Sequence, residues 1–152
     1  AIKLMMKEIY MIKKLNFFIY LISPMFSLIL IVMMWIIYPF LSNFLTLNFS
    51  LMYLMCCFSL GVYSLMMSGW SSNSSYSMLG SIRSLAQSIS YEVSLSIIMI
   101  IPMFMINYMD LSKLISVNIN YSILIYLWPL SLMFLLSMMA ELNRTPFDFS
   151  EG

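Results

Sequence analysis

Residues 15–38 read LNFFIYLISPMFSLILIVMMWIIY and contain no Asp, Glu, Lys or Arg. The uncharged stretch that begins here continues to Ile82, and two further uncharged runs cover Val93–Met109 and Leu114–Ala140. A helix of about 20 apolar residues crosses the roughly 30 Å of hydrocarbon in a bilayer. The sequence therefore predicts an all-α membrane protein.

The overall composition points to the same class. Of the 152 residues, 62% are hydrophobic and only 9% are charged, whereas a water-soluble domain carries about 25% charged residues. Seven Lys and Arg against six Asp and Glu give a net charge of +1. Because no basic stripe is present to follow a phosphate backbone, we expect no nucleic-acid partner.

We expect one transmembrane domain over residues 1–152 with about four spanning helices, at 16–38, 51–67, 82–106 and 121–140. Pro24 should not end the first helix, because neighbouring helices in a membrane can supply hydrogen-bond partners. A polar segment from Gly69 to Ser75 is expected to close the second helix. A polar link with Asp110 and Lys113 is expected to separate the third from the fourth.

The segment 1–14 is predicted to be an amphipathic helix that lies on the membrane surface. At helical spacing its two faces are apolar and basic, with Ile2, Met5, Ile9 and Ile12 on one and Lys3, Lys7 and Lys14 on the other. Most Lys and Arg residues fall on the side of the membrane that holds both termini. By the positive-inside rule, both termini face the cytoplasm or the mitochondrial matrix.

The adjacent cysteines Cys56 and Cys57 lie in the middle of the second predicted span. A vicinal disulfide or a metal pair is one interpretation, and two small apolar side chains are the other. The chain has no His, and neighbouring helical residues point in different directions, so we favour apolar packing and predict no metal site.

Glu92 is the acid that stands out within the third predicted span. It belongs to a polar stripe in which successive members are four residues apart, namely Ser84, Ser88, Glu92 and Ser96, with Gln87 and Tyr91 adjoining. For the serines we expect hydrogen bonds that hold helices together. An acid at membrane depth more often marks an ion or proton path, so Glu92 is a candidate relay residue.

A second group of charges follows the fourth predicted span. Glu141, Arg144, Asp148 and Glu151 all fall within eleven residues. Pro146 disfavours helical geometry at the residue before it, so the charges should enter a loop at the membrane face, residues 141–152. Glu141 would stay on the last helical turn, where the helix dipole penalises its anionic form. A solvated loop with an Asp–Arg pair is the alternative.

The segment 140–152, AELNRTPFDFSEG, resembles the matrix-loop signature of the NADH–ubiquinone oxidoreductase chain 1 family, membrane subunits of respiratory complex I. Three other segments resemble the family in the same order and spacing: AIKL with Lys7-Glu8, GWSSNS at 69–74 and RSLAQSISYEVS at 83–94. The resemblance covers the whole chain. It implies an interior portion of a longer subunit, holding its second to fifth spans.

The same resemblance implies roles for the charged residues. Glu92 and Glu141 correspond to acids of a proton relay that couples quinone reduction to proton translocation. Arg83, Arg144, Asp148 and Glu151 correspond to the polar matrix side of the ubiquinone cavity and are the expected substrate-binding residues. The chain would act only as a subunit of the enzyme, in the inner mitochondrial membrane, with other complex I subunits, membrane lipids and ubiquinone as partners.

No resident cofactor is expected in this chain. It has no Gly-rich phosphate loop, and its two cysteines are too few to hold an iron–sulfur cluster. The resemblance implies that NADH, FMN and the iron–sulfur clusters belong to partner subunits.

Two other functions stay open at this point. An independent proton or ion transporter should have a basic residue among its membrane acids, yet no Lys lies between Lys14 and Lys113. A non-catalytic packing subunit predicts that Glu92 and Glu141 can be replaced at little functional cost.

Overall fold

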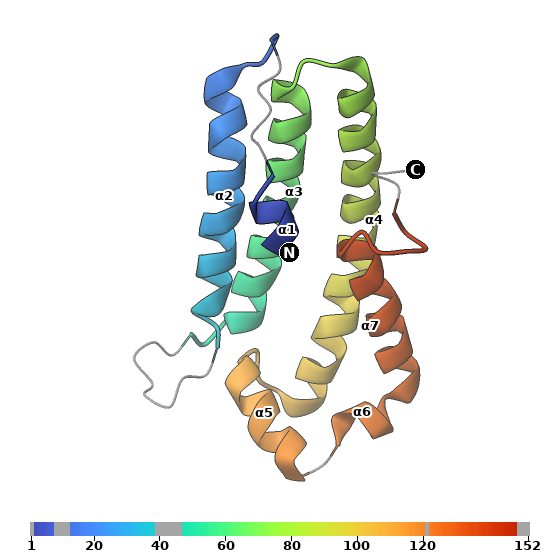
Figure 1. The fold of residues 1–152 in the computed structure, drawn as a ribbon. Helices are drawn as coiled ribbons and strands as arrows, with labels where there is room; N and C mark the ends of the chain where they lie inside the picture. The colour runs from blue at the N-terminus through green and yellow to red at the C-terminus, as the bar shows by residue number, and fades with distance from the viewer. Residues whose placement is uncertain (1, 8–12, 39–46, 121, 149–152) are drawn as a thin grey trace.

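The computed structural model describes residues 2–7, 13–38, 47–120 and 122–148, and the regular structure in these ranges is helical throughout. The helices are α1 (Ile2–Met5), α2 (Phe17–Trp35), α3 (Ser50–Ser71), α4 (Ser75–Ile106), α5 (Leu111–Asn120), α6 (Ile123–Tyr126) and α7 (Trp128–Glu141). Helix α3 contacts both α2 and α4, and α4 also contacts α7, which gives the row seen in Figure 1. The predicted all-α class is confirmed.

Helices α2, α3 and α4 are each long and apolar enough to cross a membrane, which confirms a multi-pass membrane protein. The second predicted helix continues beyond its expected end at residue 67 to Ser71, and the third begins at Ser75 instead of residue 82. The expected loop from Gly69 is therefore wrong in extent, and residues 72–74 alone form the turn.

Serine hydroxyls explain how the polar end of α3 stays helical. Ser68 and Ser71 donate to the carbonyl oxygens of Leu65 (2.8 Å) and Ser68 (2.9 Å), so these side chains bond within their own helix. At the start of α4, the Ser74 hydroxyl accepts from the backbone N–H of Ser77 and caps the new helix. Asn73 between them has φ = 50°, the left-handed conformation that a sharp reversal requires.

The range 121–140 is divided in the structure between the short α6 and the 14-residue α7. Pro129 explains the division, because it has no N–H to donate to the carbonyl of Ile125 and so interrupts the ladder. Within the first turn of α7 the same proline is well accommodated, since N–H groups there have no intrahelical acceptor.

The segment with Asp110 and Lys113, expected as a polar link, instead forms helix α5. Asp110 accepts from the backbone N–H of Ser112 (3.1 Å) and thereby caps its first turn. Ser50, at the start of α3, accepts from the N–H of Leu111 (2.8 Å) and joins α5 to the spanning helices.

Only part of the predicted surface helix at 1–14 can be compared with the structure. Helix α1 covers Ile2–Met5, and the side chain of Ile2 is 75% exposed. Ile9 and Ile12 of the predicted apolar face lie outside the described residues. The membrane-surface placement therefore stays a prediction.

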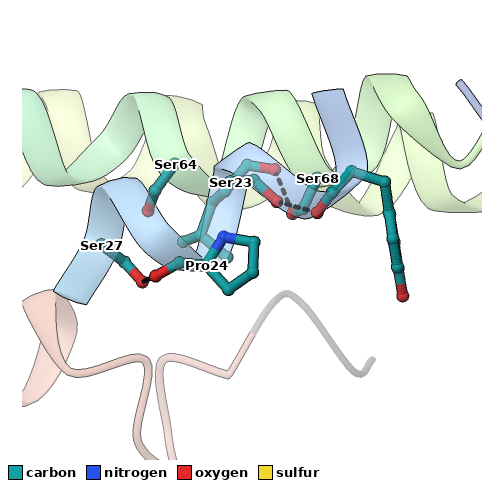
Figure 2. Close-up of a pocket in the computed structure, with 7 residues that line it drawn as sticks. Ser23, Pro24, Ser27, Ser64 and Ser68 are labelled. Atoms are coloured by element: carbon teal, nitrogen blue, oxygen red, sulfur yellow. Dashed lines mark hydrogen bonds between the residues drawn. The ribbon is translucent and has the colours of Figure 1, made fainter. Parts of the chain in front are cut away.

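Pro24 lies inside α2 without ending it, as the sequence predicts. Its missing N–H leaves the carbonyl oxygen of Tyr20 without the usual helical donor. The hydroxyl of Ser23 donates to this oxygen (3.1 Å) and restores a bond there. Figure 2 shows Ser23, Pro24 and Ser27 of α2 facing Ser64 and Ser68 of α3, and these residues help to line a cavity of about 320 Å³.

Candidate site at the junction of α4 and α7

Gln87 joins three parts of the chain at one point. Its side-chain nitrogen Nε2 donates to the carbonyl oxygens of Ala140 (2.9 Å) and Phe147 (2.7 Å). Ala140 lies near the end of α7 and Phe147 in the segment that follows, whereas Gln87 lies in the first half of α4. The side chain is 6% exposed, so these are buried polar contacts.

Helix α7 ends in a Schellman motif, which turns the chain back towards α4. The N–H of Arg144 donates to the carbonyl of Met139 (3.1 Å), and the N–H of Asn143 donates to that of Ala140 (3.2 Å). Asn143 takes the left-handed conformation that this motif requires, with φ = 48°. Asparagine tolerates this conformation better than most residues with a side chain.

Residues 142–148, which we call the returning loop, are held against α4 by an aromatic contact as well. The N–H of Phe147 donates to the carbonyl of Arg144 (2.7 Å) and closes a turn. The ring of Phe147 meets that of Tyr91 edge to face, with ring centres 5.4 Å apart. Because Tyr91 lies one helical turn beyond Gln87, both contacts use the same face of α4.

This junction brings the helices that carry Glu92 and Glu141 into contact, although the two acids are far apart in the sequence. Both side chains are half-buried. Glu141 is the last residue of α7, directly after the Ala140 carbonyl that Gln87 binds. The two predicted relay acids therefore lie on the two helices that meet here, Glu92 next to Tyr91 of the aromatic contact and Glu141 next to the carbonyl that Gln87 binds.

Three oxygen atoms here are buried and accept no hydrogen bond from the part of the chain that the structure describes. They are Gln87 Oε1, Glu141 Oε2 and Asn143 Oδ1. An amide oxygen cannot carry a hydrogen, whereas a carboxyl group can. Of the three, Glu141 alone is able to supply a donor by holding a proton.

The other predicted site residues lie on α4, in the returning loop and beyond it. Arg83 precedes Gln87 by one helical turn and is exposed, and Arg144 is exposed within the returning loop. Asp148 is half-buried at the end of that loop. Glu151 lies outside the described residues.

The serines of the polar stripe on α4 form different hydrogen bonds from those expected. The hydroxyls of Ser84, Ser88 and Ser96 donate to carbonyl oxygens of α4 itself, at 2.7–3.2 Å. The predicted hydrogen bonds between helices are therefore wrong for these side chains. Cys56 and Cys57 are both free thiols, the first exposed and the second buried.

Sequence reasoning placed Gln87 and Tyr91 beside the stripe but gave them no role. The available signal was their four-residue spacing, which places both side chains on one face of α4. Nothing local to either residue indicates that a segment more than fifty positions away supplies its partner. Asn143 could have been recognised as a helix-ending residue from its position just after the last apolar turn.

These features define the class of the molecule: a polytopic helical membrane protein with two acids at a junction of two helices, closed by a returning loop. Residues 1–152 also match the family model described as NADH dehydrogenase. The chain therefore belongs to the NADH dehydrogenase family.

Individual relatives carry a more specific name. The chain is 43% identical to NADH-ubiquinone oxidoreductase chain 1 of Locusta migratoria and 44% identical to the protein of that name from Anopheles gambiae. Identity to the protein of that name from Hylobates lar is 38%. In each case the match covers 100% of this chain and 48% of the relative, so the chain spans about half the length of these proteins.

Proposed function

We propose that the chain belongs to a membrane subunit of proton-translocating NADH:ubiquinone oxidoreductase, respiratory complex I. In this function it lines the ubiquinone tunnel and couples quinone reduction to proton translocation. The subunit is not catalytic alone. The observation that carries the proposal is the junction where Gln87 and Tyr91 of α4 bind the end of α7 and the returning loop, because Glu92 and Glu141 are carried by the two helices that meet there.

The chemistry of this pair suits proton exchange. Two carboxyl groups that interact electrostatically take up and release protons as a coupled pair. When one gives its proton to the other, the donor becomes a carboxylate and the receiver a neutral acid, so the pair conserves its total charge. A charge change at a nearby quinone would shift this balance and drive the transfer.

The loop side of the junction is the proposed quinone face. Arg144 and Asp148 of the returning loop, Arg83 of α4 and Glu151 beyond it would form the polar rim of the cavity. Arginine side chains there can donate hydrogen bonds to a quinone oxygen, and their fixed positive charge favours a negatively charged reduced form over the neutral quinone.

The proposal extends to the surroundings of the protein, and the family supports it. We place the protein in the inner mitochondrial membrane, with lipids and other complex I subunits around it. NADH, FMN and the iron–sulfur clusters would reside in those partners, because this chain offers neither a phosphate loop nor four cysteines.

The test uses Glu92→Gln and Glu141→Gln in the assembled complex. Glutamine keeps the size of the side chain and most of its hydrogen bonding but cannot titrate. We expect the ratio of protons translocated to NADH oxidised to fall in both variants, while NADH oxidation by a soluble acceptor that bypasses quinone persists. The measurement is proton uptake in sealed membrane vesicles.

Asp110→Asn is the matched control, because Asp110 is an acid between α4 and α5 whose oxygen accepts from the backbone N–H of Ser112. An Asn oxygen can accept the same bond, so the proton ratio should stay normal. If both Gln variants translocate protons at the normal ratio, the relay is refuted and the packing-subunit alternative replaces it.

A further inference from the structure

Gln87 links the two helices that carry Glu92 and Glu141, although within the described residues it forms no hydrogen bond with either acid. Gln87 lies on the same helix as Glu92 and binds the carbonyl of Ala140, the residue next to Glu141. Because this bond is 2.9 Å long and buried, it ties the backbone from which Glu141 projects to the helix that carries Glu92.

The second bond of the same amide explains why glutamine suits this position. Nε2 has two hydrogens, and the carbonyl oxygens of Ala140 and Phe147 take one each. These two carbonyls mark the beginning and the end of the turn that contains Arg144. One uncharged side chain thus closes the turn against α4, which neither a carboxylate nor a thioether could do.

We propose that Gln87 is a positioning residue that holds Glu141 in place for proton exchange with Glu92. This inference rests on the relay function proposed above. It adds a requirement that the relay alone does not make: proton coupling must be lost when the amide is removed, even though both acids remain.

Gln87→Met tests this requirement, since methionine has similar length and no strong donor. We expect proton-coupled quinone reduction to fall by about tenfold or more, because a displacement of about 1 Å can cost a reacting group about a hundredfold in rate. NADH oxidation by a soluble acceptor should persist. Ser94→Ala is the control, because that α4 hydroxyl donates to Tyr91 O within its own helix (2.8 Å), and it should leave both rates unchanged.

A double-mutant cycle separates positioning from general stabilisation. If Gln87 acts through Glu141, adding Gln87→Met to the Glu141→Gln variant causes no further loss of coupling. An equal loss in both backgrounds would overturn the proposal and make Gln87 an ordinary packing residue. Normal coupling in Gln87→Met, with Glu141→Gln impaired, would also overturn it while the relay stands.

Two further outcomes complete the test. If Glu92→Gln and Glu141→Gln are both normal, the relay fails and the role of Gln87 fails with it. If Gln87→Met does not assemble, Gln87→Asn keeps the two donors on a shorter side chain and should show intermediate coupling. Failure of both variants to assemble would assign Gln87 to folding and refute its positioning role.

Discussion

Gly69 of α3 lies so close to Ser81 of α4 that a Cβ atom at position 69 would overlap the Cβ and Oγ of Ser81. The same Cβ would stand 3.2 Å from the carbonyl oxygen of Ser77, which cannot move without distorting α4. A glycine at this crossing therefore sets the distance between two of the three long helices.

Gly69→Ala should accordingly destabilise the protein, by about 1–3 kcal/mol as in other overpacked contacts. Gly61 is the control on the same helix, because a Cβ there would meet nothing within 4 Å. Gly61→Ala should be neutral or gain up to about 1 kcal/mol of helix propensity. Thermal unfolding of the assembled complex measures both, and equal midpoints would contradict the close crossing.

The contact between Tyr91 and Phe147 predicts how firmly the returning loop is held. Tyr91→Leu removes an edge-to-face ring pair. Such a pair stabilises a fold by about 0.5–1.5 kcal/mol in addition to the effect of burying its apolar area. We expect faster proteolytic cleavage within residues 142–148 and a small loss of stability. Tyr76→Leu, at a position that is 86% exposed, should leave the cleavage rate unchanged. Unaltered cleavage in Tyr91→Leu would mean that the ring does not secure the loop.

Ser50 links the start of α3 to helix α5. Its hydroxyl, in a side chain that is 3% exposed, accepts from the N–H of Leu111 and donates to Asp110 (3.4 Å). Ser50→Ala should cost about 1 kcal/mol, as the loss of a helix cap does. Hydrogen exchange at Leu111 should then become faster. Ser116→Ala, which removes only a bond to the carbonyl of Lys113, is the control.

Orientation in the membrane is open to direct test by labelling. The N–H of Asn16 at the start of α2 donates to the carbonyl of Ser71 at the end of α3 (3.0 Å), so these ends share one side. With Cys56 and Cys57 replaced, Lys13→Cys should react with an impermeant thiol reagent from the matrix side alone. Ser112→Cys should react from the opposite side. The reverse pattern would refute the positive-inside assignment.

Much of the helical architecture could be predicted from the sequence, because uncharged runs long enough to span a bilayer leave few alternatives. Helix α2 lies within its predicted range. The helix boundaries at Ser71 and Ser75 could not be predicted from the uncharged runs. Serine is compatible both with a loop and with a helix whose carbonyl oxygens its hydroxyl binds. The break before α7 follows from Pro129, which hydropathy alone does not register.

The candidate site was predictable one residue at a time but not as an arrangement. Glu92 and Glu141 each stand out as acids beside apolar runs, and this is a local signal. Their placement relative to each other depends on where α7 meets α4, and the hydrogen bonds of Gln87 to a distant segment are part of that contact. Periodicity describes one helix at a time, so it cannot supply the register between two.

The bond from Ser23 to the carbonyl of Tyr20 has a consequence for how this sequence can change over time. While Pro24 is present, losing the serine hydroxyl leaves a backbone oxygen at membrane depth without a donor, so selection should act against it. Once any other residue replaces Pro24, its own N–H can donate to that oxygen, and the serine hydroxyl at position 23 is no longer needed. The two positions should therefore covary among descendants, with the proline lost before the serine and regained only where a hydroxyl already stands beside it.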